Sequence, residues 1–366
     1  MSDAVLEAER PAAAKTGVVD CDIHPAYSSP AEMVSFLPQR WKDHVKEFGI
    51  ANPGLYVGAL SYPRMASGGM RRDATPPNGG PAASDLAFLQ QQLLDSYNIE
   101  YGILQPLSAG HGANNLELGV ALCHATNDWQ VEKWLSKEPR LRGSISVQQD
   151  DAEAAVREIE ERAPDRRFVQ VAITPRTMEP LGRKRYWPIF EAAEHYGLPI
   201  GIHSAAFGWH SNTPSGWSSF YIEEHFAFSN AAQTSLTSMI FEGVFDAFPK
   251  LNLVLVEGGF AWLPPLMWRM EREWDRMRNE VPHLKLAPWD YARRNVYLTT
   301  QPVEEPTVNK HLFDVLRWVG SDRLLFSTDY PHWDFDDPAR AFKVPLAPSD
   351  RQAIMRENAM ALYRLG

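Results

Sequence analysis

The sequence predicts a (β/α)8 barrel. Eight short apolar runs alternate along the chain with eight helical patterns, which is typical of this fold. Most runs resemble Leu253-Val254-Leu255-Val256, the pattern of strands buried on both faces of a parallel sheet. The length of 366 residues would also allow two domains, but eight strand–helix pairs favour one barrel with insertions.

The expected elements follow one another without an internal repeat. Ser84-Asp85 and Ser349-Asp350 are helix-start signals, and Gly197 and Pro249 follow helical patterns as stop signals. The expected strands are 18–24, 101–106, 143–148, 168–174, 199–204, 251–257, 295–301 and 324–329. The expected helices are 85–97, 116–136, 151–162, 187–196, 233–248, 263–280, 304–319 and 349–364.

Two connections are too long for ordinary loops of a barrel. We expect residues 27–83 to form a cap over the barrel mouth and the aromatic-rich residues 205–229 to form a packed lid. Residues 1–16 are expected to be a flexible segment before a single barrel domain at 17–366. The aromatic lid suggests a substrate with an apolar or aromatic portion.

Composition excludes several classes of protein. Lys and Arg number 36 against 46 Asp and Glu, a net charge of −10 that disfavours nucleic acids and anionic membranes as partners. No apolar run reaches the roughly 20 residues of a membrane span, and no secretory signal precedes residue 17, so a cytoplasmic location is expected. Cys21 and Cys123 are the two cysteines, too few for a disulfide scaffold or a cysteine zinc cluster.

Metal-binding residue types stand at the ends of four expected strands. Asp22 and His24 end the first strand and, two residues apart, point the same way. His203, Glu257 and Asp329 end the fifth, sixth and eighth strands. Because the carboxyl ends of barrel strands meet at one mouth, the sequence predicts a bound cation there. Asp20 lies one layer deeper and is expected to be structural or to support these residues.

Several motifs resemble the amidohydrolase superfamily, in particular the amidohydrolase-related branch that includes aminocarboxymuconate-semialdehyde decarboxylase. The motifs are Asp22-x-His24, His203, the segment from Thr328 to His332, and Glu257-Gly258-Gly259, and the resemblance covers nearly the whole chain. It implies that Asp22, His24, His203 and Asp329 bind one divalent metal. Zinc is the first expectation, with iron or manganese as alternatives. In this interpretation Asp329 moves protons for a metal-activated water.

Two departures from the superfamily pattern matter. The fourth strand, 168–174, lacks the lysine that bridges two metals in many relatives, so a single metal is the simpler expectation. Decarboxylases of this branch usually carry His where this chain has Glu257. We consider three roles for Glu257: a general base, a ligand shared with His225 for a second metal, or a structural carboxylate beside the Gly258-Gly259 turn.

The expected activity is metal-dependent hydrolysis of a small carbonyl- or carboxylate-containing organic acid or thioester. Alternatives are non-oxidative decarboxylation at the same metal, oxygenation at a dinuclear non-haem iron site as a monooxygenase, and a non-catalytic subunit stabilised by its metal. His111 and His332 are weaker candidates for lining the substrate site. The expected partners are a small-molecule substrate and a second copy of the chain, as a dimer, or related subunits.

Overall fold

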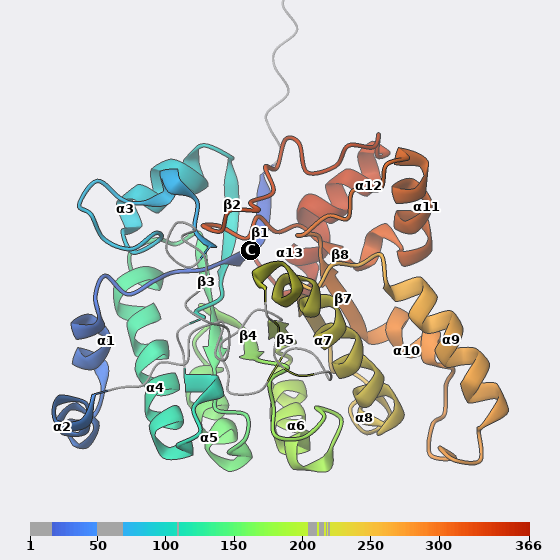
Figure 1. Ribbon diagram of the computed structural model, residues 1–366, viewed down its shortest axis with the longest axis horizontal. Helices are drawn as coiled ribbons and strands as arrows, with labels where there is room; N and C mark the ends of the chain where they lie inside the picture. The colour runs from blue at the N-terminus through green and yellow to red at the C-terminus, as the bar shows by residue number, and fades with distance from the viewer. Residues whose placement is uncertain are drawn as a thin grey trace, which may run out of the picture.

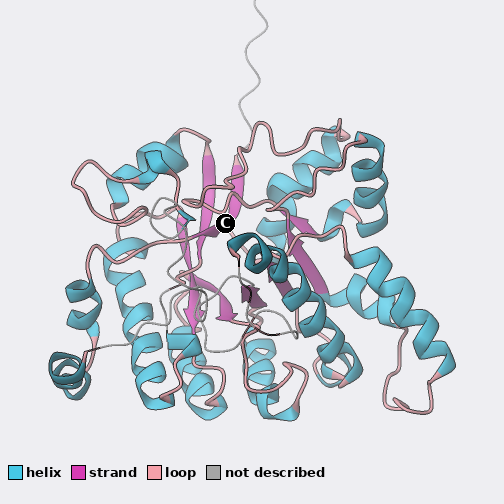
Figure 2. Cartoon of the chain, viewed as in Figure 1, coloured by secondary structure: helices cyan, strands magenta, loops and turns pink. Residues whose placement is uncertain are grey.

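The predicted (β/α)8 barrel is confirmed by a computed structural model that describes residues 17–49, 69–107, 110–203, 211, 216, 218 and 220–366. Each strand pairs in parallel with the next, from the first strand to the eighth. Helices surround these strands (Figure 1; Figure 2). The strands are β1 Val18–Ile23, β2 Ile99–Leu104, β3 Leu141–Ser146, β4 Phe168–Ile173, β5 Ile200–His203, β6 Leu253–Val256, β7 Val296–Thr299 and β8 Leu324–Leu325.

The sheet closes where the segment after β8 meets β1. The amide of Cys21 donates to the carbonyl of Phe326 at 2.9 Å, and the amide of His24 donates to that of Tyr330 at 2.8 Å. β8 itself has two residues, whereas the sequence predicted a strand over 324–329. The regular pairing ends early because the next amides donate elsewhere: that of Phe326 to the carbonyl of Ile354 at 3.0 Å, and that of Thr328 to the carboxylate of Asp20 at 2.9 Å.

The helices match the predicted pattern with local differences. The expected helices 85–97, 116–136 and 349–364 each contain a π-helical stretch, namely Gln90–Asp95, Gln130–Leu135 and Ala353–Glu357. None of the described helices is long and apolar enough to cross a membrane. The α-helices are α1 Pro30–Phe36, α2 Gln39–Phe48, α3 Leu86–Leu89, α4 Leu116–Trp129, α5 Ala152–Arg162, α6 Trp187–Tyr196, α7 Tyr221–Phe241, α8 Val244–Ala247, α9 Leu263–Arg276, α10 Pro288–Asn295, α11 Asn309–Val319, α12 Pro348–Gln352 and α13 Asn358–Leu362.

Two helix starts were predicted wrongly. α7 begins twelve residues before the expected start at 233, inside the stretch assigned to a lid loop, because the side chain of Glu223 accepts the free amide of Phe220 at 2.8 Å. α11 begins five residues after the expected start at 304, since the carboxylate of Glu304 instead accepts the amides of Phe260 and Ala261 at 3.0 Å.

A small apolar cluster fills the barrel interior. It joins residues of β1, β2, β4, β6 and β8, which only the interior can bring together, and the last helix adds Leu362 and Tyr363. A much larger cluster lies between the strands and the surrounding helices. Val256 belongs to the inner cluster, so β6 fills the barrel up to the residue before Glu257. The members of the inner cluster from the strands are Val19, Cys21, Ile103, Val169, Val254, Val256 and Leu325.

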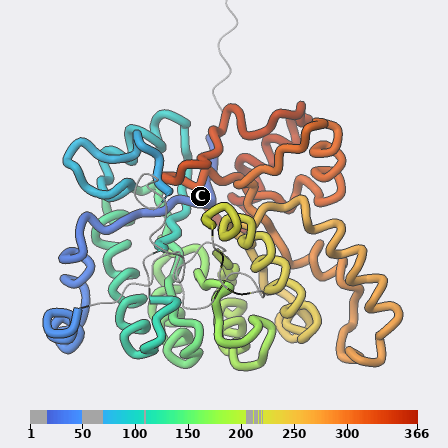
Figure 3. The backbone as a smooth tube through the Cα atoms, in the orientation of Figure 1, coloured from blue at the N-terminus to red at the C-terminus, as the bar shows by residue number. Residues whose placement is uncertain are grey.

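The expected cap and lid lie partly outside the described residues. The first part of the cap forms α1 and α2, which run from the barrel to lie beside α4 (Figure 3), where Met33 and Trp41 pack against Leu122. Residues 50–68 of the cap and residues 205–210, 212–215, 217 and 219 of the lid are outside the described part, as is the expected flexible segment 1–16. Gly69 and Arg71 pair with the loop after β8.

Candidate metal centre

Four buried side chains bring metal-binding atoms together at the carboxyl end of the barrel. Asp22 and His24 come from the end of β1, His203 from the end of β5 and Glu257 from the residue after β6. One ligand atom of each lies within 4.8 Å of the others. The sequence predicted that these four residues would face one mouth, and the structure brings them together there.

The spacing of these atoms suits a divalent ion. Nε2 of His24 lies 3.2 Å from Oδ1 of Asp22. Nε2 of His203 lies 3.4 Å from Oδ1 of Asp22 and 3.4 Å from Oε2 of Glu257. Donors bound at roughly 2.1 Å to one tetrahedral or octahedral ion lie about 3.0–3.4 Å apart. The distances therefore fit neighbouring corners of one coordination shell.

Several of these atoms have no hydrogen-bond partner among the described residues. They are both carboxylate oxygens of Asp22, both ring nitrogens of His203 and Oε2 of Glu257. All three side chains are nearly excluded from solvent. Because a buried polar atom without a partner is costly, a cation between Oδ1 of Asp22, Nε2 of His203 and Oε2 of Glu257 would satisfy these three facing atoms together.

The ring of His24 is oriented for ligation. Its Nδ1 lies 2.9 Å from the backbone carbonyl of Gln105, a contact that places the ring proton on Nδ1. Nε2 then carries a lone pair, and it faces Oδ1 of Asp22 and, at 2.8 Å, Oδ1 of Asp329. A lone pair that faces carboxylate oxygens is repelled by them unless a proton or a cation lies between, and a metal ion bound by these donors would meet that need.

Asp329 and His332 form a second, overlapping group with His24. Nδ1 of His332 lies 2.6 Å from Oδ1 of Asp329. The side-chain Nε2 of Gln301 donates to Oδ2 of Asp329 at 3.3 Å. Asp329 is thus held by hydrogen bonds beside the first group. His332, predicted as a residue lining the mouth, is buried and contacts Asp329 directly.

Two of the site carboxylates stand on left-handed backbone. Glu257 has φ +54° and Asp329 has φ +61°, values that non-glycine residues rarely adopt. The hydroxyl of Thr299 accepts the amide of Glu257 at 3.0 Å, and the Asp20 carboxylate holds Thr328 just before Asp329. Strained backbone of this kind is concentrated at functional sites in proteins.

Burial sets the charges of the site. It lowers the pKa of His24 and of His203 to about 3, so both imidazoles are neutral, the form that binds metals. Burial raises the pKa of Asp22 to about 6. Burial first and neighbouring carboxylates second raise the pKa of Glu257 and of Asp329 well above the usual range.

The remaining predicted residues are less central. His225, on the first turns of α7, is partly exposed, and its Nε2 lies 2.9 Å from Oδ2 of Asp334. His111 is buried, and its Nδ1 lies 3.0 Å from the backbone carbonyl of Val147, so it ties two loops together. The sharing of a second metal by His225 and Glu257 stays a hypothesis.

Two residues at the mouth were missed in the sequence. Gln301, just after β7, donates to Oδ2 of Asp334 at 2.9 Å. Burial works against the charge of Asp334, but the hydrogen bond from His225 and its charge prevail and lower the pKa of Asp334. Gln301 ended the expected seventh strand, so the strand-end rule could have found it. Asp334 lies in a loop beyond any strand and carried no such signal.

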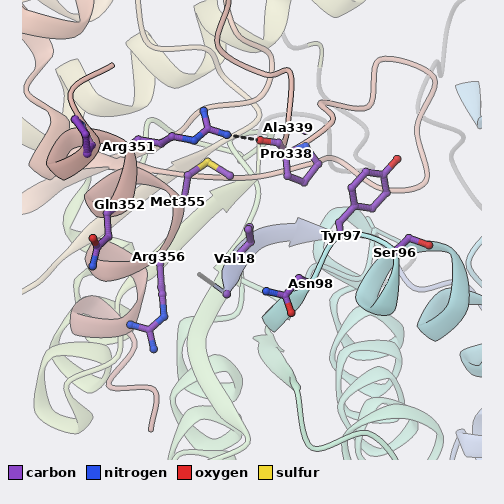
Figure 4. A pocket seen from close by; sticks show the side chains of 12 residues that line it. Val18, Ser96, Tyr97, Asn98, Pro338, Ala339, Arg351, Gln352, Met355 and Arg356 are labelled. Atoms are coloured by element: carbon purple, nitrogen blue, oxygen red, sulfur yellow. Dashed lines mark hydrogen bonds between the residues drawn. The ribbon is translucent and has the colours of Figure 1, made fainter. Parts of the chain in front are cut away.

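A separate pocket lies at the opposite end of the barrel. It has a volume of about 490 Å³ and is bordered by Val18, at the start of β1, and by Asn98, just before β2 (Figure 4). The guanidinium of Arg351 donates to the carbonyl of Pro338, and that of Arg356 pairs with Glu100. None of the donor residues described above lines this pocket.

The fold and the strand-end donors together define the class of metal-dependent barrel enzymes. A family model described as amidohydrolase matches residues 19–365, and the chain belongs to this family. The resemblance to the amidohydrolase superfamily is thereby confirmed.

Relatives of known activity are similar along most of the chain. A gamma-resorcylate decarboxylase of Polaromonas is 26% identical over 323 residues, which are 82% of this chain and 94% of that enzyme. A crystal structure of dihydroxybenzoic acid decarboxylase from Polaromonas contains bound manganese and the inhibitor 2-nitroresorcinol. It has a TM-score of 0.67 and 22% identity to this chain, and the match covers 95% of this chain and 97% of that enzyme. The 5-carboxyvanillate decarboxylase of Sphingomonas paucimobilis has a TM-score of 0.70 and 22% identity, with 96% and 99% covered.

Proposed function

We propose that this protein is a metal-dependent decarboxylase that releases carbon dioxide from a small hydroxylated aromatic acid without an oxidant. The observation that carries this proposal is the similarity to gamma-resorcylate decarboxylase along 94% of that enzyme. The convergence of Asp22, His24, His203 and Glu257 at the barrel mouth supports it, because the similar dihydroxybenzoic acid decarboxylase of Polaromonas holds bound manganese.

The proposed ion is manganese. Carboxylate oxygens suit Mn²⁺ better than zinc, and a structural neighbour binds manganese. Zinc, the first expectation from the sequence, receives no support from the comparisons. When bound, the ion supplies Lewis acidity that holds the anionic oxygens of the substrate and stabilises negative charge in the ring.

Asp329 is the proposed proton carrier. In decarboxylation the bond between the ring and the carboxylate breaks, carbon dioxide leaves, and one proton is added to the ring carbon. Burial raises the pKa of Asp329, which favours the protonated form that can donate. His332 and Gln301 contact its two oxygens and hold the carboxyl group in place while it accepts and returns the proton.

Aromatic side chains at the mouth support an aromatic substrate. Trp333 Nε1 donates to the hydroxyl of Tyr221 at 2.7 Å, which joins the loop after β8 to α7. The ring of His225 lies 5.8 Å from that of Trp333. These rings, on α7 and on the loop that carries Asp329 and His332, offer flat apolar faces suited to a ring of the size of a hydroxybenzoate.

The comparisons favour decarboxylation over hydrolysis, the main expectation from the sequence. The sequence led to hydrolysis because strand-end donors are common to both reactions, and the carboxylate of Glu257 in place of histidine suggested water activation. Which bond breaks depends on how the substrate lies in the site, and the residue types do not encode that. The comparisons give no support to the iron monooxygenase alternative.

The test is a decarboxylation assay on the full chain loaded with manganese. Purified protein is mixed with 2,6-dihydroxybenzoate, 5-carboxyvanillate and related hydroxybenzoates, and carbon dioxide and the phenol product are measured. In deuterium oxide the product is expected to carry one deuterium at the carbon that lost its carboxylate. Asp329→Asn is expected to abolish turnover and keep the fold. Absence of carbon dioxide across the panel would refute the proposal.

A further inference from the structure

We infer that Glu257 is a ligand of the same metal ion as Asp22, His24 and His203. The inference rests on the metal centre of the proposed function, and it selects one of the three roles that the sequence left open for this residue. It assigns to this chain an additional carboxylate donor where decarboxylases of the branch usually carry histidine.

The position of the carboxylate carries the inference. Oε2 of Glu257 lies 3.4 Å from Nε2 of His203, the same distance that separates that nitrogen from Oδ1 of Asp22. Nε2 of His203 therefore stands between two carboxylates from different strands. Oε2 has no hydrogen-bond partner among the described residues, and Glu257 is 3% exposed. Such an atom, buried and aimed at other donors, has the environment of a ligand.

The backbone is arranged to turn this side chain inward. Val256 already fills the barrel interior, so strict alternation would direct the next side chain toward the surrounding helices. The left-handed conformation at Glu257 reverses that direction, and the hydroxyl of Thr299 fixes it by accepting the Glu257 amide. Residues other than glycine rarely adopt this left-handed conformation, yet a glutamate adopts it at this position.

A structural role in the turn that follows is already filled by another residue. The carboxylate of Glu304 accepts the amides of Phe260 and Ala261 through the same oxygen, at 3.0 Å each. Those donors would have been the natural partners of a structural Glu257. Likewise, Nε2 of His225 contacts Asp334, and the donors grouped with Glu257 among the described residues are Asp22, His24 and His203.

The experiment measures manganese binding without substrate, so that it is independent of decarboxylation. Apoprotein prepared with a chelator is titrated with Mn²⁺, and the loss of the free-ion electron paramagnetic resonance signal gives the dissociation constant. Glu257→Gln is expected to weaken binding at least about tenfold and to change the spectrum of the bound ion. Glu257→Asp, which keeps the charge, is expected to recover part of the affinity.

Glu304→Gln is the matched control. Its Oε1 can still accept both amides, so the variant removes one buried charge beside the site and leaves the loop contacts intact. We expect wild-type affinity and an unchanged spectrum for it. If Glu257→Gln binds Mn²⁺ as tightly as the wild type with the same spectrum, Glu257 is not a ligand. If that variant does not fold, an unchanged affinity and spectrum in Glu257→Asp would overturn the inference. If the wild type binds no Mn²⁺, the proposed metal centre itself fails.

Discussion

Asp20 is expected to hold the metal centre together although, within the described residues, its only hydrogen bond to a proposed metal ligand is to the backbone amide of Asp22. Its Oδ1 accepts the amide of Thr328 at 2.9 Å and the amide of Asp22 at 3.2 Å. Its Oδ2 accepts the hydroxyl of Thr328 at 2.6 Å. The two bonds from Thr328 join β1 to the segment after β8, where the strand ladder is interrupted, and the bond from Asp22 stays within β1. Asp20→Ala would remove all three acceptors at once.

The expected cost follows from the donors that would be left without acceptors. Two buried amides and one hydroxyl lose their acceptors, and an unsatisfied buried donor costs about 1–3 kcal/mol. Since the hydroxyl can rotate, we expect Asp20→Ala to lower the free energy of unfolding by about 3–5 kcal/mol. The anchored segment carries Asp329, so manganese affinity should also fall, by roughly 10–100-fold.

Asp20→Asn provides the matched comparison. Its side-chain oxygen can still accept both amides, because in the native protein both bonds end on Oδ1. Only the bond to the Thr328 hydroxyl must reverse direction, at a cost of about 1 kcal/mol. Urea unfolding followed by circular dichroism, together with manganese titration, measures both quantities. The reasoning would be refuted if Asp20→Ala lost less than about 1 kcal/mol, or if the two variants were equally destabilised.

Three further predictions concern the metal and two ion pairs. Removing the metal with a chelator should lower the melting temperature, measured by differential scanning fluorimetry. Manganese at roughly 100 times its dissociation constant should then raise the free energy of unfolding by about 2.7 kcal/mol and restore the melting temperature. An unchanged melting temperature would contradict a bound ion. Arg176 and Glu224 form a buried pair, so Arg176→Met should cost about 3–5 kcal/mol in urea unfolding, and adding Glu224→Gln should recover part of it. The hydrogen bond with Glu158 raises the pKa of His124. The stability of that pair is therefore fully present below about pH 6.5 and is lost as the pH rises through the raised pKa of the folded protein. His124→Gln should remove this pH dependence. In the wild type the pair should change the free energy of unfolding by less than about 1 kcal/mol between about pH 6 and pH 9. If this free energy changed equally with pH in both proteins, the result would count against the pair.

Local signals in the sequence predicted the fold and the first donors. Apolar runs mark strands buried on both faces, and the rule that catalytic groups stand at the carboxyl ends of barrel strands pointed to Asp22, His24, His203, Glu257 and Asp329 without any tertiary information. The start of α7 was not predicted, because the aromatic residues that open this helix are as common in loops. Its first turn depends on a capping contact from Glu223.

Residues that reach the site only through tertiary contacts could not be predicted from patterns within one segment of the sequence. Asp334 lies in the loop after β8 and reaches the mouth through its contacts with His225 and Gln301. The path of that loop follows from its pairing with residues 69–71, which belong to the insertion after β1. A pattern within one segment carries no information about such a pairing.

The orientation of the two left-handed carboxylates depends on neighbours that do not ligate. Alternation along a strand decides direction only while the backbone stays extended, and at Glu257 and Asp329 it does not. Each residue would escape this strained conformation unless other contacts held it, and those contacts come from Thr299 and Asp20. Both polar side chains act on backbone amides at or next to the strained residue. The geometry offered to a metal is therefore set in part by Thr299 and Asp20, which are not themselves proposed ligands.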